Sequence, residues 1–432
     1  MKNKKKLLFI QLNEINFEFI DDYIEKLGLK NLGAIKNDGL IETSSEKKYE
    51  HLEPWIQWAS VTTGKTLNEH KIFRLGDIVN YGDDQIYELI EQMNFKVGAI
   101  CPMNVENRLK NPSYFIPDPW TNTESDKSFW SKNISKTLSQ AINDNAKNKI
   151  SLKSIFFLCL SFIKFARYKN YLKFIFYFLT SFNKKWRKAI FLDLFLHEVH
   201  LSNINKFNPN FSTIFFNAFA HIQHHYLYNS QPINGKYKNP EWYIENRYDP
   251  IAEALIVYDE IIGDYLKKID SNLIIATGLR QVPFEKIKFD YRLKNHAKFL
   301  KNLKIKFLRV EPRMTGDFLI SFERDSDTIN AYKILSKLRT NDNELIFNKI
   351  ENRGKSIFLT LTYDKEVSKN IYIVNENQKI NFERYTDFVG IKNGKHDEKG
   401  YSYFRGEIEK FSIKQNDHVK NIFHSINNYF VS

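Results

Sequence analysis

Residues 7–27, LLFIQLNEINFEFIDDYIEKL, decide the fold class. The first six residues are almost entirely apolar, which is typical of a strand that is buried on both faces of a sheet. The polar pair Asn13 and Glu14 ends this run, and residues 17–27 then have helical spacing. A buried strand followed directly by a helix predicts an α/β domain, in which helices flank a central sheet.

Further segments have the same buried-strand composition. They are FKVGAIC (95–101), TIFFNAF (213–219) and LIIAT (273–277), the last after a helical pattern over 251–268. Ligands of open α/β sheets gather at the carboxyl ends of the strands. We therefore expect the polar residues at these ends to lie close together: Asn13, Glu14, His221 with its neighbours, and residues 277–281.

The C-terminal third alternates strand-like and helical patterns. The strand-like pieces are 317–323, 356–363 and 370–376, and the helical ones lie near 327–338 and 417–430. Two arrangements fit this order: the segment completes the central sheet, or it forms an attached α+β lobe.

The chain is basic, with 64 Lys and Arg against 51 Asp and Glu in 432 residues, a net charge of +13. This excess favours a polyanionic neighbour, although a lysine-rich composition alone also produces it. Two cysteines, Cys101 and Cys159, exclude a disulfide framework and a cysteine-based zinc module. The first apolar run is too short for a signal peptide. We expect a cytoplasmic protein, with a location peripheral to the inner membrane as the alternative.

Residues 146–192 differ from the rest of the chain. They contain eleven Lys or Arg, no Asp or Glu, and the aromatic runs SIFFLCLSFI and FIFYFLT. This pattern predicts a basic aromatic helical insertion, which acts as an anion-binding cap or contacts an anionic membrane surface. Alternatively, its apolar stripes pack on the main domain. The expected domains are 1–145 with 193–432, and the insertion 146–192.

Histidines and a helix start supply candidate chemistry. His221, His224 and His225 follow the third strand as a strand-end loop and can present imidazoles to a metal or a phosphate. A helix over 58–63 ends at Gly64, and its N-terminus near Pro54 aims backbone N–H groups at an anion.

These pieces, in this order, resemble the alkaline phosphatase superfamily, most of all its type I phosphodiesterase and nucleotide pyrophosphatase branch. LLFIQLNE stands at the first metal-binding strand, WIQWASVTTGKTLNEHKI is similar to the nucleophile segment, and FFNAFAHIQHHYL is similar to a metal-binding strand end. His396 with Gly400 is similar to the last metal-binding turn. The resemblance covers residues 7–406 without the insertion. It implies an alkaline phosphatase-like α/β fold, and hydrolysis or transfer of phosphate or sulfate esters.

The chain departs from the superfamily pattern at several metal ligands and at the nucleophile. Asn13 stands at the first metal-binding Asp, Glu53 and Pro54 stand at the nucleophile, and residues 276–281 replace Ser-Asp-His-Gly. We therefore expect one divalent ion, zinc or similar, in place of two. The candidate ligands are Glu14, Asn13, His221, His224 and His396.

The candidate catalytic residues are Glu53, His70 and Arg280. In a metal-free alternative, Arg280, His70 and Arg74 hold an anion while Glu53 or a histidine acts as acid or base. A phosphoester or sulfate ester hydrolase or transferase is the favoured function, with a phosphorylated glycan or lipid precursor as one substrate class. An inactive relative that binds an anionic ligand or a partner protein is the alternative. Nucleic acid is a disfavoured partner, since no zinc-knuckle or RNA-binding signature is present.

Overall fold

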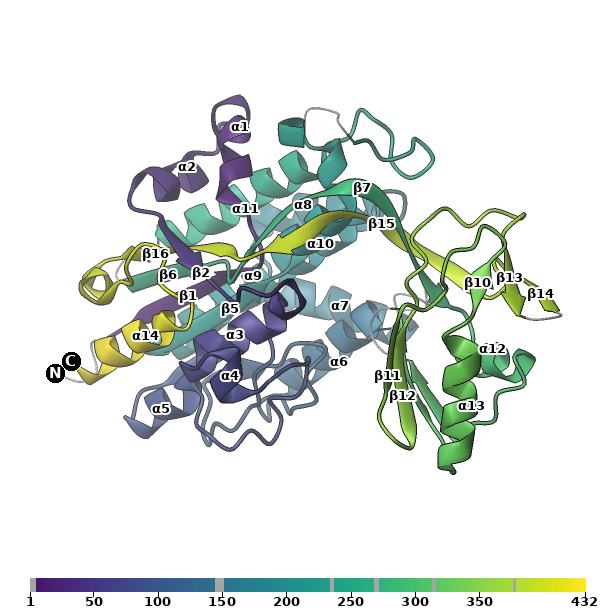
Figure 1. Cartoon of the computed structure of the whole chain (residues 1–432). Coiled ribbons are helices and arrows are strands. Elements are labelled where there is room, and N and C mark those ends of the chain that lie inside the picture. The colour runs from purple at the N-terminus through teal and green to yellow at the C-terminus, as the bar shows by residue number, and fades with distance from the viewer. Residues whose placement is uncertain (1–4, 144–150, 234–236, 268–271, 313–315, 376–377) are drawn as a thin grey trace. The chain divides into compact units, whose positions relative to one another are not determined.

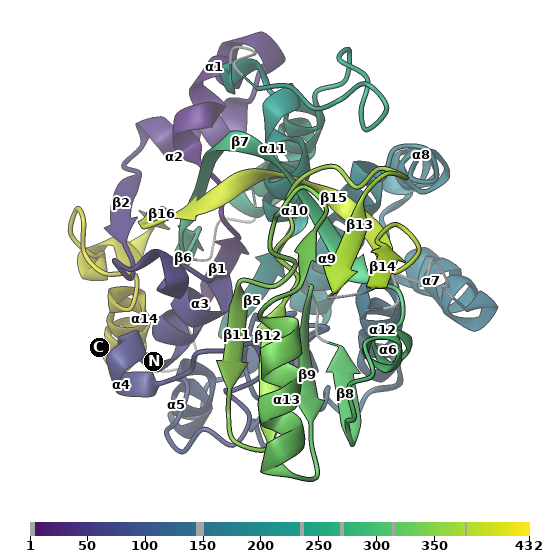
Figure 2. The same cartoon turned by 45° about the vertical axis from the view of Figure 1, so that its right-hand side comes forward.

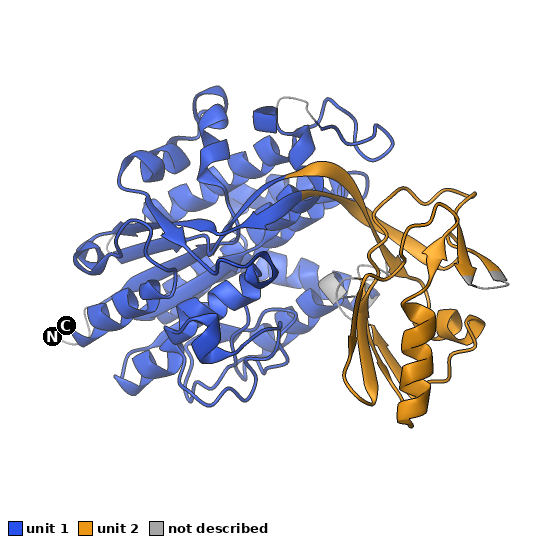
Figure 3. Cartoon of the chain, in the orientation of Figure 1, with its two compact units in different colours: residues 1–283, 394–432 blue, residues 284–393 orange. Residues whose placement is uncertain are grey.

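A computed structural model describes residues 5–143, 151–233, 237–267, 272–312, 316–375 and 378–432. The chain forms two compact units, residues 1–283 with 394–432 and residues 284–393 (Figure 3). Two long strands that pair with one another, β7 (Arg280–Leu293) and β15 (Thr386–Asp397), run from the first unit into the second. The residues predicted to carry chemistry all lie in the first unit.

The first unit is built on a seven-stranded sheet of order β2-β16-β6-β1-β5-β3-β4. Its strands are β1 (Leu7–Leu12), β2 (Ile41–Ser44), β3 (Val97–Ile100), β4 (Tyr114–Ile116), β5 (Phe211–Phe216), β6 (Asn272–Ala276) and β16 (Lys399–Arg405). The central strand β1 runs parallel to both β5 and β6, whereas β16 runs antiparallel to its neighbours. The expected α/β sheet is confirmed, and the carboxyl ends of β1, β5 and β6 meet at one edge.

Helices cover both faces of this sheet (Figure 1). One face carries α1 (Phe17–Leu27), α2 (Lys30–Asn37), α9 (Trp186–Phe207), α10 (Ala218–Tyr226) and α11 (Pro250–Leu266); the other carries α3 (Pro54–Thr63), α5 (Ile86–Gln92) and α14 (Asn421–Val431). Successive residues of β1 point to opposite faces, so Ile10 and Leu12 join the first core and Leu7 and Phe9 join the second. This explains why the strand reads as one continuous apolar run.

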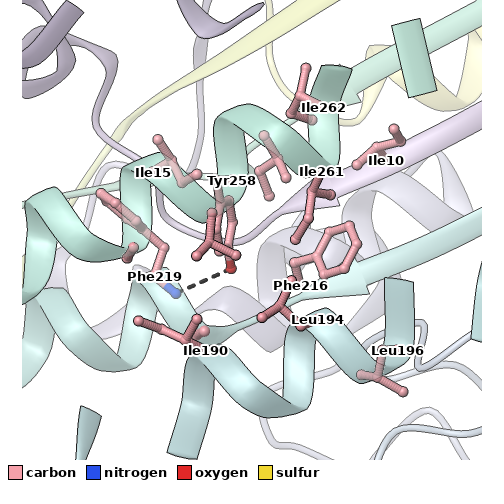
Figure 4. Packing of buried hydrophobic residues seen from close by; sticks show 14 of the residues in the cluster. Ile10, Ile15, Ile190, Leu194, Leu196, Phe216, Phe219, Tyr258, Ile261 and Ile262 are labelled. Carbon is pink, nitrogen blue, oxygen red and sulfur yellow. Dashed lines mark hydrogen bonds between the residues drawn. The ribbon is translucent and has the colours of Figure 1, made fainter. Parts of the chain in front are cut away.

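The core beside β1 also contains polar contacts that fix helices on the sheet (Figure 4). Tyr258 of α11 is fully buried between Phe216 and Phe219. Its hydroxyl accepts a hydrogen bond from the backbone N–H of Phe219 at 3.2 Å. This bond satisfies a free N–H at the start of α10, and so it helps to set where that helix begins.

Local signals in the sequence explain the helix boundaries. Asn16 caps α1 by accepting a hydrogen bond from the backbone N–H of Glu18, and Gly28 ends the helix with φ 65°. Helix α3 ends at Gly64 with φ 71°, as expected. It begins at Pro54, where its N-terminus was expected, because proline is favoured at the first helical position.

The basic aromatic segment is mostly helical over its described residues, 151–192, with breaks at 166–167 and 181–185; residues 146–150 lie outside the described part. It contains α7 (Leu152–Phe165), α8 (Tyr171–Thr180) and the beginning of α9. Helix α9 continues through residue 192 to Phe207, so the segment is joined to the main domain without a break. Helix α6 (Phe129–Asn143) precedes it. Among the described residues, no helix is both long and apolar enough to cross a membrane.

The second unit has its own core and sheets. It contains α12 (His296–Asn302), α13 (Asp325–Leu335), β8 (Arg309–Pro312), β9 (Asp317–Ser321), β10 (Arg339–Thr340), β11 (Lys349–Asn352), β12 (Ser356–Thr360), β13 (Tyr372–Asn375) and β14 (Gln378–Asn381). Its four-stranded antiparallel sheet β11-β12-β9-β8 packs around Phe299, Phe318 and Ile357. The C-terminal third therefore does both things that the sequence allowed: most of it forms an α+β lobe, and β16 completes the central sheet.

Candidate metal centre

Glu14 lies at the carboxyl end of β1, between the ends of β5 and β6. Two backbone hydrogen bonds fix the chain here. Asn13 N–H donates to Phe216 O at the end of β5 at 3.1 Å, and Glu14 N–H donates to Thr277 O just after β6 at 3.0 Å. Glu14 itself has φ 61°, a left-handed conformation that non-glycine residues rarely adopt. Its side chain is only 2 % exposed. Such strain is found at sites where the surrounding structure dictates the position of one side chain.

Two histidines from distant parts of the chain meet this carboxylate. His224 on α10 places Nε2 3.3 Å from Glu14 Oε2, and His396 at the end of β15 places Nε2 3.2 Å from the same oxygen. The two Nε2 atoms are 3.3 Å apart. One oxygen and two nitrogens therefore form a nearly equilateral triangle.

The outer nitrogen of each ring has its own partner. His224 Nδ1 lies 3.2 Å from the Gly394 carbonyl oxygen, which can only accept, so this nitrogen carries the proton. His396 Nδ1 lies 3.6 Å from Glu53 Oε2. A carbonyl or carboxylate behind the imidazole is the usual outer partner of a metal-bound histidine, because it orients the ring.

The triangle fits a divalent ion. Tetrahedral zinc binds nitrogen and oxygen at about 2.0–2.1 Å, which separates neighbouring ligands by about 3.3–3.4 Å. Two histidines and one carboxylate also leave a fourth position open, as in catalytic zinc sites. Glu14, His224 and His396 are thus the residues that would hold the ion.

Carboxamides surround Glu14 on its other sides. Asn13 Nδ2 donates to Glu14 Oε1 at 2.9 Å and to Asn217 Oδ1 at 2.8 Å, while Asn13 Oδ1 accepts from Trp58 Nε1. Gln281 Nε2 donates to Glu14 Oε2 and to the Ala220 carbonyl. Amide NH₂ groups are donors and cannot bind a cation. These donors occupy the other sides of the Glu14 carboxylate, which leaves room for one ion beside it. Both polar atoms of the Asn13 side chain already form hydrogen bonds.

We call Glu14, His224 and His396 the triad. Electrostatic interactions within it shift the pKa values of Glu14 and His396. Burial by itself raises the pKa of Glu14, but the neighbouring His396 and His224 hold it well below its usual range. Burial lowers the pKa of His396, yet the charges of Glu14 and Glu53 outweigh it and raise that pKa to about 9. Without metal, the site therefore holds a Glu14 carboxylate and a His396 imidazolium at neutral pH.

We expect metal affinity to rise with pH. Below about pH 9 the ion must displace the proton of His396. The apparent dissociation constant for Zn²⁺ should therefore fall about tenfold per pH unit up to that pH and then level off. Titration calorimetry at pH 7, in buffers of different ionisation enthalpy, should show about one proton released per ion. Affinity that does not change with pH would contradict this protonation state.

The other predicted ligand, His221, lies apart from the triad. The strand expected to run to Phe219 ends at Phe216, and the histidines lie on helix α10 rather than in a loop. Of the three histidines, His224 is the one with a described contact to Glu14. His221 is exposed and lies one helical turn from His225, with the two ring centroids 4.9 Å apart.

His70 is engaged elsewhere. Its Nδ1 accepts from the Ile72 backbone N–H at 2.9 Å, so Nε2 carries the proton and donates to Ser60 Oγ at 3.1 Å. Burial lowers the pKa of His70 to about 4, which keeps the ring neutral. His70 therefore joins α3 to α4 (Leu67–His70).

Arg280 is buried among acceptors. Its guanidinium contacts Asp397 Oδ1 at 2.8 Å, Glu18 Oε1 at 2.6 Å and the Tyr401 hydroxyl at 3.0 Å. With two carboxylates bound, this cation has no net charge to offer a substrate. Its contact with Asp397, next to His396, makes it a positioning residue for the end of β15.

Glu53 lies beside the triad and precedes the first turn of α3. Its side chain makes no capping bond to that helix and is 34 % exposed, so its carboxylate is reachable from solvent as well as from His396. Of the candidate catalytic residues, Glu53 alone contacts a member of the triad among the described contacts.

Sequence reasoning named Asn13 as a candidate ligand and placed Gln281 at this edge only as part of residues 277–281, and it did not name Gln223. Gln223 Nε2 donates to the Glu14 carbonyl at 2.7 Å, and the amides of Asn217 and Gln281 complete the shell. Amides follow no ligand spacing, so pattern searches overlook them. The available signal was position, because Gln281 falls where the resemblance places Ser-Asp-His-Gly. Gly394 leaves room for this amide, since a Cβ there would lie 2.0 Å from Gln281 Oε1.

No protein family and no curated protein sequence matches the chain. Solved structures do. Phosphonoacetate hydrolase from Sinorhizobium meliloti, in complex with phosphonoformate, matches with 11 % identity and a TM-score of 0.42 over 99 % of this chain and 96 % of that one. Murine ectonucleotide pyrophosphatase / phosphodiesterase 5 matches with 10 % identity and a TM-score of 0.41, over 99 % and 95 %. TAB5 alkaline phosphatase with bound Mg matches with 11 % identity and a TM-score of 0.41, over 99 % and 98 %.

These proteins belong to the alkaline phosphatase superfamily. The sequence motifs of this chain resemble the same superfamily. At these identities and TM-scores the matches carry no conclusion about this chain, and the chemistry of the site follows from its own residues.

Proposed function

We propose that this protein binds one divalent ion through Glu14, His224 and His396, and hydrolyses or transfers esters of phosphate or sulfate. The observation that supports this most directly is the convergence of three ligand atoms, 3.2–3.3 Å apart, at the carboxyl edge of the sheet. When bound, such an ion supplies positive charge that polarises a phosphoryl oxygen. The net charge of +13 suits an anionic substrate.

Glu53 acts as the general base in this proposal. Pro54 occupies the place where a hydroxyl nucleophile would begin α3, so water or an alcohol must attack the phosphorus or sulfur atom. The Glu53 carboxylate takes the proton of the attacking hydroxyl while the new P–O or S–O bond forms. The ester bond breaks, and the leaving oxygen takes up a proton from solvent. Asn13 and Gln281 keep the Glu14 carboxylate in place.

Turnover of simple esters tests the proposal. The substrates are p-nitrophenyl phosphate, bis-p-nitrophenyl phosphate and p-nitrophenyl sulfate, followed by phosphorylated glycan and lipid precursors. Glu53→Gln should lower kcat by about 10²–10⁴-fold while metal stays bound, as expected when a general base is lost. Turnover that survives both Glu53→Gln and the loss of His224 and His396 would reject the site.

A binding role without catalysis is the second candidate. It is favoured by the absence of a hydroxyl at Glu53–Pro54 and by the amides that stand where further ligands would be needed. In that case, phosphate or AMP should raise the melting temperature, because a ligand that binds only the folded state stabilises it. No product should form under the same conditions.

A further inference from the structure

In the described part of the chain, helices α7 and α8 carry a group of large apolar side chains that are exposed. Phe156, Leu160 and Ile163 lie on one side of α7, and Leu172, Ile175 and Leu179 on one side of α8. They are between 40 % and 83 % exposed. We call these six residues the α7–α8 face. Such a large group of exposed apolar side chains is uncommon on a soluble protein and marks an interaction surface.

The two helices form one platform on the first unit. Phe162 of α7 packs against Tyr171 and Phe174 of α8, with ring centroids 4.8 and 4.6 Å apart. Both helices also pack on α9. Figure 2 shows α7 and α8 on the same side of the unit. The helices that carry the exposed side chains are therefore held in place by one another and by α9.

Positive charge borders this face. Lys153 and Lys164 on α7, and Lys185 just before α9, are exposed and form no ion pair with any described residue. Lys169 and Lys173 pair with Asp264 and Glu260. The segment 146–192 itself contains no Asp or Glu.

We propose that the α7–α8 face docks on the surface of an anionic lipid bilayer. Apolar side chains bordered by lysine are the pattern of helices that lie in the membrane interface. Helices of 14 and 10 residues are too short to cross a bilayer, which needs about 20. A second copy of this chain is disfavoured as the occupant, because the same face would bring lysine against lysine. The proposal does not depend on the metal centre, since the two share no residue.

Vesicle flotation tests the docking. The full chain is mixed with vesicles of phosphatidylcholine alone, or of phosphatidylcholine and phosphatidylglycerol in equal parts. Wild type should float with the anionic vesicles only. Ile163→Asp/Leu172→Asp should weaken binding at least tenfold. Each change removes an aliphatic group that the bilayer would bury, and adds a negative charge that the anionic lipid repels. Lys153→Gln/Lys164→Gln/Lys185→Gln should weaken it by roughly fivefold for each lysine.

The control makes the same kind of change elsewhere. Leu308→Asp/Ile329→Asp alters two residues of the second unit that are 70 % and 60 % exposed, and should leave flotation unchanged. Circular dichroism and the melting temperature should show that all variants fold. The proposal is overturned if wild type does not float, if the control weakens binding equally, or if both test variants float like wild type. Self-association of wild type in sedimentation experiments, lost in Ile163→Asp/Leu172→Asp without any flotation, would assign the face to a second copy.

Discussion

Replacing His224 and His396 together by alanine should abolish metal binding. Wild-type protein purified without chelator or His-tag is expected to contain about one equivalent of zinc or a similar ion. The double variant keeps only the Glu14 carboxylate of the three ligand atoms. A single carboxylate is too few for a stable site, since divalent ions usually take at least three protein ligands. Elemental analysis should therefore give less than about a tenth of an equivalent.

The matched control lies on the same helix. His221→Ala/His225→Ala removes as many imidazoles from α10, but from the face where these two rings contact one another. It should keep the full equivalent of metal. Metal that persists in the first variant, or disappears from the control, would show that the ion binds elsewhere. Because His224 and His396 lie 172 residues apart, joint dependence on both also tests the fold.

Replacing Arg167 by alanine should destabilise the protein by about 3 kcal/mol, the lower end of the range for breaking a buried ion pair. Arg167 lies between α7 and α8, and its Nε is 3.0 Å from both oxygens of Glu198. Its NH2 reaches Asp264 at 2.5 Å. The Glu198 side chain is 1 % exposed, so the variant leaves a buried carboxylate without its cation. Urea unfolding should show a lower midpoint with an unchanged slope.

Arg247→Ala provides the comparison. Arg247 is 69 % exposed and pairs with Glu245 on the surface, so its loss should leave the urea midpoint nearly unchanged. Equal effects of the two substitutions would show that the Arg167 contacts do not stabilise the fold. The same contacts explain why His197, Glu198 and Asp264 need no metal, although their ligand atoms lie close together. The guanidinium of Arg167 bonds to both carboxylates, and Lys169 Nζ lies 3.4 Å from Asp264, so two cations already balance the two negative charges.

The sequence predicted the architecture of the first unit well, because the signals involved are local. The apolar run of β1, the Asn16 and Gly28 caps of α1 and the Gly64 end of α3 act through contacts within a few residues. Parallel strands place their carboxyl ends at one edge, so the sequence also indicated that Glu14 would lie near the histidines after β5. The second unit was not separated, because β7 and β15 continue unbroken through its boundary.

Only the tertiary structure decided how the site is composed. Which histidine of α10 faces Glu14 depends on where β5 ends and on the rotation of the helix, and a shift of one residue would present a different ring. The pairing of Arg280 with Glu18 and Asp397, and the amide shell around Glu14, join residues hundreds of positions apart. Sequence by itself therefore determined which chemical groups gather at the sheet edge. Tertiary packing decided which of these groups bond to one another. The chemical role of an imidazole, amide or guanidinium depends on the hydrogen-bond partners within about 3 Å of it.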